Sequence, residues 1–254
     1  MTTINDVNQY DVIVVGSGAG AMTSAIFAAD QGKSVLIVEK SDKYGGTSAI
    51  SGGGIWIPNN DEFKALGGKD SYESALTYIK AASQDSVAES RIRAYLDNAP
   101  KMLRELQANT HVRFAVADKY PDYYPHLEGS LPGGRTMDPE LFDTTGLGDE
   151  MDNQQPASGN TLLMGKMSWT ARQAHMAVAK QRGWMLMIVG LMLRYKLDFK
   201  QRKKGKRDRR AGLGASLVAS LRQSVADRKI PLWRNTEFTD FVISDHLLFL
   251  DISW

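Results

Sequence analysis

Residues 10–22 read YDVIVVGSGAGAM, and the fold prediction is built outward from this stretch. Tyr10 to Val15 is an apolar run rich in β-branched residues that ends at a glycine, so it predicts a buried parallel strand. Ala19 to Gln31 has a helical composition with Gly32 after it, and Ser34 to Val38 is a second apolar run. Strand, glycine turn, helix and strand within about 30 residues predict one βαβ unit.

The turn between the first strand and the helix matches the dinucleotide-binding pattern G-x-G-x-x-G/A. A glycine in the first place allows the sharp turn, one in the second lets a pyrophosphate approach the backbone, and a small third residue allows close packing. The helix N-terminus adds free N–H groups and a partial positive charge. Glu39 ends the second strand, where it can accept hydrogen bonds from a ribose and disfavours NADP. The predicted binding residues here are Gly16, Ser17, Gly18, Ala19, Gly20, Ala21 and Glu39.

A second glycine-rich segment, residues 40–60, reads KSDKYGGTSAISGGGIWIPNN and is not expected of a simple NAD enzyme. Its glycines would let backbone pass close to a pyrophosphate, a ribityl chain and a flat ring, and its hydroxyls could meet ring nitrogens or carbonyls. A flexible surface loop is the alternative, although the flanking Trp56 and Ile57 favour an ordered segment. We therefore expect FAD, bound additionally by Lys40, Gly45, Gly46, Thr47, Ser48, Ser51, Gly52, Gly53 and Gly54.

The rest of the chain fits one α/β domain over residues 1–254. Helices are predicted near 72–82, from Ser86 onward, over 168–182, and where apolar residues recur every four positions from Leu213 to Val225. Ser86 and Glu89 form a plausible capping box, and Pro100 is expected to end or kink the second of these helices. Residues 230–234 and 237–243 read as strands. Residues 114–165 have few periodic signals and are predicted to be a long irregular region facing the active site.

Composition excludes several classes of function. The net charge of +2 gives no general attraction to nucleic acid. The chain has no cysteine, which excludes disulfides, iron–sulfur clusters and a thiol nucleophile, and fits a reducing cytoplasm. No secretory signal is recognisable at the N-terminus, and the spacing of the four histidines suggests no metal site.

The run from Lys200 to Arg210 holds eight basic residues and one acidic residue, Asp208. It follows the apolar stretch Trp184 to Leu193, which is about half as long as a bilayer span. Three interpretations remain: a solvated helix end beside a buried helix, peripheral membrane contact through residues 184–210, or nucleic-acid binding. The run contains no interleaved aromatic residues, which argues against nucleic acid.

Several stretches together resemble the 3-ketosteroid dehydrogenases, FAD enzymes of the wider fumarate reductase and succinate dehydrogenase flavoprotein superfamily. They are YDVIVVGSGAGAM, VEKSDKYGGTSAISGGGIWIPNN, YPDYYP, LPGGR, GKMSWTARQAH and IPLWRNTEFTDFVI, and they run from about Tyr10 to Ile243. The resemblance implies a Rossmann-like FAD-binding domain with a three-layer parallel sheet core. It also implies oxidation next to a steroid 3-ketone, or a similar hydrophobic substrate, in which a base removes the α proton and a hydride passes from the β carbon to FAD.

The resemblance also assigns roles to single residues. Tyr123 is the best match to a family tyrosine that assists the base, with Tyr124 second, and packing of the loop is the alternative role for both. Members with a covalent flavin use a histidine in the loop matching residues 45–54; this chain has none there, so a non-covalent FAD is expected. The alternatives are a steroid 4-ene dehydrogenase, a fumarate-reductase-like flavoprotein, or an inactive FAD-binding fragment.

Residues 244–254, SDHLLFLDISW, depart from the family pattern. Members of the family are longer, and at this point they turn at a glycine into another strand. By resemblance, we expect that the steroid-binding domain and the base tyrosine lie in a part that this chain does not contain.

Overall fold

A computed structural model describes residues 9–244 and 247–253, with side chains described for 9–159 and 161–240. Its helices are α1 (Ala19–Asp30), α2 (Gly46–Ile50), α3 (Asp61–Ala65), α4 (Tyr72–Ser83), α5 (Glu89–Asn109), α6 (Ala171–Val178), α7 (Trp184–Leu197), α8 (Phe199–Lys204) and α9 (Leu213–Asp227), with 3-10 helices η2 (Thr144–Asn153) and η3 (Gly159–Thr161). Its strands are β1 (Val12–Val15), β2 (Val35–Val38), β3 (Ile55–Trp56), β4 (Phe114–Val116), β5 (Thr136–Pro139), β6 (Phe142–Asp143), β7 (Arg210–Ala211), β8 (Leu232–Trp233), β9 (Glu237–Ser244) and β10 (Leu247–Ser253).

A parallel three-stranded sheet in the order β1-β2-β8 forms the base of the fold. Val12 pairs with Val35 and Val15 with Val38, and α1 crosses between these two strands, so the predicted βαβ unit and α/β class are confirmed. All four residues of β2 are buried, as expected of a central parallel strand. The prediction that the first strand is buried is wrong: β1 is half-buried and Val15 is 54% exposed, because β1 is an edge strand of this sheet.

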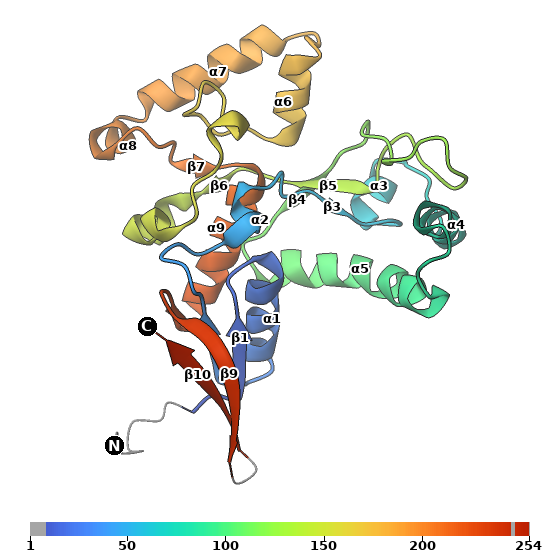
Figure 1. The fold of residues 1–254 in the computed structure, drawn as a ribbon. Coiled ribbons are helices and arrows are strands. Elements are labelled where there is room, and N and C mark those ends of the chain that lie inside the picture. Colours follow the sequence, from blue (N-terminus) through green and yellow to red (C-terminus); the bar gives the residue numbers. More distant parts are fainter. Residues whose placement is uncertain (1–8, 245–246, 254) are drawn as a thin grey trace.

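Helix α9 connects the sheet to the rest of the core (Figure 1). Its neighbours are α2, α1 and η2, and Leu217, Leu221 and Val225 are at most 7% exposed. The four-residue apolar spacing thus correctly predicted a helix, and the structure shows that it is buried. Its small residues, including Ser220 and Ala219, let helices pack on it from several sides.

A second layer lies beside this core. Strands β3, β5 and β4 form an antiparallel sheet in that order, and α4 packs against α5. The region from 114 to 165, predicted to be irregular, therefore contains strands and two 3-10 helices among its loops. Strands β4, β5 and β6 of this region are two to four residues long, which is too short to show an alternation of apolar and polar residues.

The start and the middle of α5 differ from expectation. The helix does not end at Pro100 but continues to Asn109, because Ala99, Leu103 and Leu106 anchor it in the core on both sides of the proline. The capping box is absent: the N-cap is Ala88, and the Ser86 hydroxyl donates to Ser83 O at 2.6 Å.

The predicted helix over 168–182 is shorter than expected. Helix α6 covers only Ala171–Val178, capped by Thr170 and Gln173, and α7 and α8 follow it. At the chain end, β10 pairs antiparallel with β9, so residues 247–253 of the atypical tail form a hairpin strand; residues 245, 246 and 254 lie outside the described residues. Within the described part of the chain, every helix is too short or too polar to cross a membrane.

Candidate cofactor site

The predicted dinucleotide turn is held by Ser17, a side chain only 1% exposed. Its backbone N–H donates to Glu39 Oε2 at 3.0 Å and its hydroxyl donates to the same oxygen. The hydroxyl also accepts from Gly45 N at 2.9 Å. Ser17 thus joins the turn after β1, the end of β2 and the loop before α2, which places three separately predicted segments at one site.

Glu39 lies at the carboxyl end of β2, as expected of a ribose-binding acid. Its Oε2 accepts from Ser17 and its Oε1 accepts from Ser41 N at 3.0 Å. An ionised carboxylate has about four acceptor positions, so capacity remains for a ribose hydroxyl. Lys40, the next residue, is exposed and makes no ion pair within the described residues.

The N-cap residue of α1 provides no side-chain hydrogen bond to the first turn. Gly18 is the N-cap and there is no acidic residue in the first turn. Ala19 N donates to Ser48 Oγ at 3.1 Å. Gly20 and Ala21 follow in the first turn, where an α-helix offers its N–H groups no intrahelical acceptor. This end of the helix can therefore receive an anion.

The glycines of the site divide into two groups. Gly45 has φ +105° and a Cβ there would lie 2.8 Å from Val218 Cγ1, while a Cβ on Gly53 would lie 2.7 Å from Gly214 N. Packing of the chain itself therefore requires these two glycines. A Cβ on Gly20 or Gly52 would meet nothing within 4 Å, so open space lies beside both. Such space beside free donors fits a bound dinucleotide.

The hydroxyls of α2 are only partly available. Ser48 Oγ accepts from Ala19 N, and Ser51 Oγ donates to Ser48 O at 2.8 Å and accepts from Gly53 N. Thr47 is exposed next to Gly46, and its hydroxyl makes no hydrogen bond within the described residues. Thr47 is therefore the hydroxyl of this group that is free to meet a ligand.

Two further glycines complete the site and were not predicted. A Cβ on Gly214 would lie 2.1 Å from Ser48 O, and one on Gly212 would lie 2.3 Å from Trp169 O. Gly214 N also donates to Ser51 O at 3.0 Å. Gly214 thus lets the start of α9 press directly against α2, and Gly212 lets it approach Trp169. The sequence signal was the run AGLGAS at residues 211–216, which spans the start of this helix.

A cavity of about 410 Å³ opens beside the loop predicted to face the flavin ring. Gly52 and Gly54 form one side of it, and Trp56, Tyr120 and Asp138 contribute to the wall. Burial raises the pKa of Asp138, with a smaller opposing effect from Arg172. The cavity is thus a partly desolvated space next to the predicted ring position.

The structure places the predicted catalytic tyrosines at the rim of the molecule. Tyr123 is 82% exposed and Tyr124 44% exposed, and their rings meet edge to face at 5.1 Å. Tyr123 borders a shallow groove with Trp56, Tyr78 and Tyr120. The loop carries Tyr120, Tyr123 and Tyr124. Of these, Tyr120 is the one that lines the cavity beside Gly52 and Gly54.

A buried ionic cluster fixes this tyrosine loop. Arg135 is fully buried and pairs with Asp70 at 2.7 Å and with Asp122 at 2.8 Å. Asp122 also accepts from Trp56 Nε1 at 2.7 Å and from Leu131 N at 2.8 Å. Although burial raises it, the pKa of Asp70 is lowered overall because Arg135 donates to its carboxylate. This cluster could not be predicted from the sequence, because its members are far apart in the chain.

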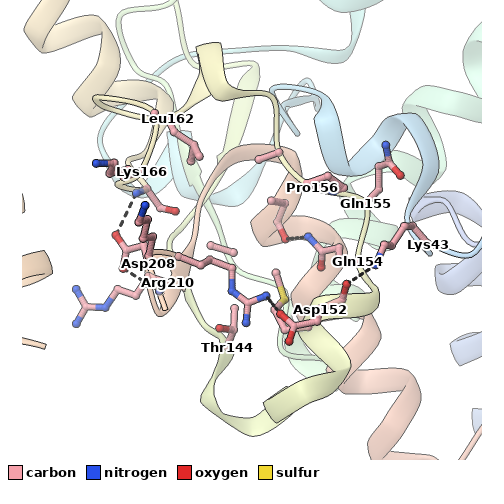
Figure 2. Close-up of a pocket in the computed structure, with 18 residues that line it drawn as sticks. Lys43, Thr144, Asp152, Gln154, Gln155, Pro156, Leu162, Lys166, Asp208 and Arg210 are labelled. Carbon is pink, nitrogen blue, oxygen red and sulfur yellow. Dashed lines mark hydrogen bonds and ion pairs between the residues drawn. The ribbon is translucent and has the colours of Figure 1, made fainter. Parts of the chain in front are cut away.

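A larger cavity, about 540 Å³, lies between η2 and the start of α9 (Figure 2). The predicted cofactor residues are not among those that line it. Charged residues of its wall bind to one another: Lys43 Nζ donates to Asp152 O at 2.8 Å, and Arg207 pairs with the Asp152 carboxylate at 2.6 Å. This cavity is therefore separate from the predicted cofactor residues around Ser17.

Comparison with known proteins identifies the type of domain. The family model described as an FAD binding domain matches residues 11–248. A 3-oxosteroid 1-dehydrogenase of Comamonas testosteroni is 41% identical over 235 residues, covering 92% of this chain and 41% of the relative. A 4-oxocyclohexanecarboxylate 2-dehydrogenase of Sinomonas cyclohexanicum is 44% identical over 146 residues, covering 57% of this chain and 25% of the relative.

A solved structure is also similar. The crystal structure of 3-ketosteroid delta1-dehydrogenase from Sterolibacterium denitrificans, in complex with 1,4-androstadiene-3,17-dione, has 49% sequence identity and a TM-score of 0.91, covering 96% of this chain and 46% of that one. The chain thus spans less than half of the length of the relatives it matches. The chain belongs to the family of FAD-binding domains, and its likeness to the 3-ketosteroid dehydrogenases extends over almost all of its length.

Proposed function

We propose that this chain is the FAD-binding part of a dehydrogenase that introduces a carbon–carbon double bond next to a ring ketone. The observation that carries the proposal is the junction at Ser17, which brings the glycine turn, Glu39 and the Gly45 loop together next to the start of α1, whose N-cap residue provides no side-chain cap. The relatives support the substrate class: one acts on a 3-oxosteroid and another on 4-oxocyclohexanecarboxylate, and both names describe ring ketones.

Different groups of residues would bind different parts of the cofactor. The turn from Gly16 to Ala21 would hold the pyrophosphate, Glu39 and Lys40 the adenosine side, and residues 45–54 the ribityl chain and ring. When bound, FAD supplies a two-electron acceptor for the hydride that leaves the β carbon. The α proton goes to a base, and the double bond forms between the two carbons. We expect non-covalent binding, because no histidine or cysteine lies in residues 40–60.

Tyr123, with Tyr124 second, is the proposed helper of the base. Tyr120 is a further candidate on the structural observation that it lines the cavity beside Gly52 and Gly54. Separate Phe substitutions at 120, 123 and 124, made in a protein that turns over, would rank them. Loss of the proton-transfer step without loss of FAD would identify the helper.

Titration with FAD tests the cofactor assignment. We expect a yellow complex absorbing near about 450 nm whose flavin is released by acid precipitation, and a rise in Tm as FAD saturates. A colourless protein whose Tm does not respond to FAD would overturn the proposal. Flavin that stayed with the precipitated protein would overturn the non-covalent part alone.

Activity is tested separately with an artificial electron acceptor. We expect little or no turnover of either a 3-ketosteroid or 4-oxocyclohexanecarboxylate by the purified chain, because it matches less than half of each relative. Steady oxidation of one of these ketones would contradict that expectation and would at the same time identify the substrate class.

A further inference from the structure

The Trp56 indole forms part of the wall of the cavity beside Gly52 and Gly54, and it also borders the shallow groove next to Tyr123. Gly54 comes directly before β3, and Trp56 is the last residue of this strand. Side chains two positions apart in a strand point to the same face, and the two residues are about 7 Å apart along the chain. Trp56 therefore presents a large aromatic surface next to the segment proposed to bind the flavin ring.

The indole of Trp56 is held in one orientation by several different contacts. Its Nε1 donates to Asp122 Oδ1 at 2.7 Å. The guanidinium of Arg135 lies over its ring, 5.4 Å from the centroid. The rings of Tyr78 and Tyr95 lie beside it at centroid distances of 5.8 Å and 6.4 Å. Rotation of the indole would break the hydrogen bond and lose the contact with the cation, so its orientation is fixed.

Asp122 joins this indole to the tyrosine loop. It follows Tyr120 by two residues and is 3% exposed. While its Oδ1 accepts from Trp56, its Oδ2 accepts from Arg135 Nη1 at 2.8 Å and from Leu131 N at 2.8 Å. Its own backbone N–H donates to Leu131 O at 2.9 Å. A single buried carboxylate thus sets the position of the loop relative to the indole.

The other carboxylate of the cluster, Asp70, has different partners. It accepts from Arg135 Nη2 at 2.7 Å and Nε at 3.0 Å, and from the backbone of Asn59 and Ser71. Its hydrogen bonds among the described residues do not include Trp56 or the tyrosine loop. One carboxylate is enough to neutralise Arg135, and a second buried charge costs desolvation. Charge balance therefore does not explain why a second carboxylate, Asp122, lies at the indole.

We propose that Asp122 is a positioning residue, which holds Trp56 and the tyrosine loop together as one aromatic wall beside the flavin ring. The assignment of the ligand rests on the proposed function, whereas the fixed geometry of the wall does not. Oxidation of a ring ketone requires the β carbon to lie at the flavin while the α carbon lies at the base, so a fixed wall behind the flat ring favours reaction. Asp122 touches neither ligand in this role and acts through the indole and the loop.

The indole N–H signals of the five tryptophans test the positioning in a proton–nitrogen correlation spectrum without any ligand. W56F identifies the Trp56 signal by its loss. D122N should move this signal upfield, because an amide oxygen accepts a weaker hydrogen bond than a carboxylate. D70N should move it much less. This control is matched because both carboxylates are buried on Arg135, so both variants should lower Tm to a similar extent.

The fluorescence of bound flavin tests whether the wall lies at the ring. An indole close to the isoalloxazine quenches its emission, so W56F should raise the emission per bound FAD at least about twofold. D122N should raise the emission as well, and D70N should not. The double variant W56F/D122N should match W56F, because Asp122 affects the flavin through the indole.

Two results would overturn the proposal: a Trp56 signal that responds equally to D122N and D70N, or flavin emission that W56F leaves unchanged. If D122N does not fold, D122E takes its place, because it keeps the charge, moves the carboxylate by one methylene group and should still displace the Trp56 signal. A chain that binds no FAD would contradict the proposed function, and the indole signals would still decide whether Asp122 positions Trp56.

Discussion

Gly45 and Gly18 belong to the same site but are glycines for different physical reasons. Gly45 has positive φ and no room for a Cβ beside Val218, so G45A should lower the free energy of unfolding by about 2–4 kcal/mol. Gly18 has an ordinary φ, and a Cβ there would meet only Ser48 Oγ at 3.3 Å. G18A should therefore lower the free energy of unfolding by at most about 1 kcal/mol. Urea denaturation without FAD measures both, and equal losses would contradict this division.

Gly18 and Gly20 should matter more for the ligand than for the fold. If a pyrophosphate lies against the turn, G18A should weaken FAD binding at least tenfold while remaining folded, because its methyl group occupies the line of approach. The Cβ of G20A would meet nothing of the chain within 4 Å and alanine favours a helix, so its stability should match or exceed the wild type. Its methyl group would still enter the space assigned to the dinucleotide, so G20A should also weaken FAD binding. Titration of the three proteins by flavin fluorescence gives the comparison.

Asp138 should make stability depend on pH. Burial raises the pKa of its carboxyl above the unfolded value, so the charged form at neutral pH is less stable in the fold than in water. The stabilising neutral form is fully present below the unfolded pKa and is lost as pH rises through the folded pKa. D138N should therefore raise Tm at pH 7 and have little effect near about pH 3, and a Tm gain of equal size at both pH values would contradict the assignment.

At the scale of elements, the tyrosine loop depends on the ionic cluster at Arg135. Removing one partner of a buried pair leaves an uncompensated charge, so D122N should lower the free energy of unfolding by about 3–5 kcal/mol. Amide exchange should rise mainly in residues 120–134, because Asp122 also holds Leu131 N and Trp56. D118N alters an exposed carboxyl of the same loop and should change neither. Unchanged exchange in D122N would show that other contacts hold the loop.

The elements also show what the sequence could and could not predict. The βαβ unit and α9 were predictable because each is long enough to repeat its apolar spacing. The glycine turn from Gly16 to Ala21 was predictable because its pattern is contiguous, and its binding of FAD stays a prediction. The short strands β3 to β6 carry no such repeat. Gly214 and Arg135 become meaningful only through partners distant in sequence. Pro100 does not end α5 because tertiary packing on both sides of it outweighs the lost hydrogen bond.

Viewed as a whole, the molecule separates into a body that would hold the cofactor and an arm, formed by α6, α7 and α8, that faces outward (Figure 1). The cofactor residues lie on the turn after β1, at the end of β2 and around α2, all tied to α9, whereas the arm is held at its base by Arg194 on Asp208 and Ser168. Because FAD would contact only the body, it should stabilise the body and leave the arm unchanged.

Amide exchange with and without FAD tests this separation. FAD at about one hundred times its Kd should slow exchange about a hundredfold in residues 16–21 and 39–54, and leave α7 unchanged. Equal protection of α7 would mean that the arm closes over the cofactor. Protection of neither region would contradict the proposed cofactor site, because FAD must contact the backbone that it is said to cover.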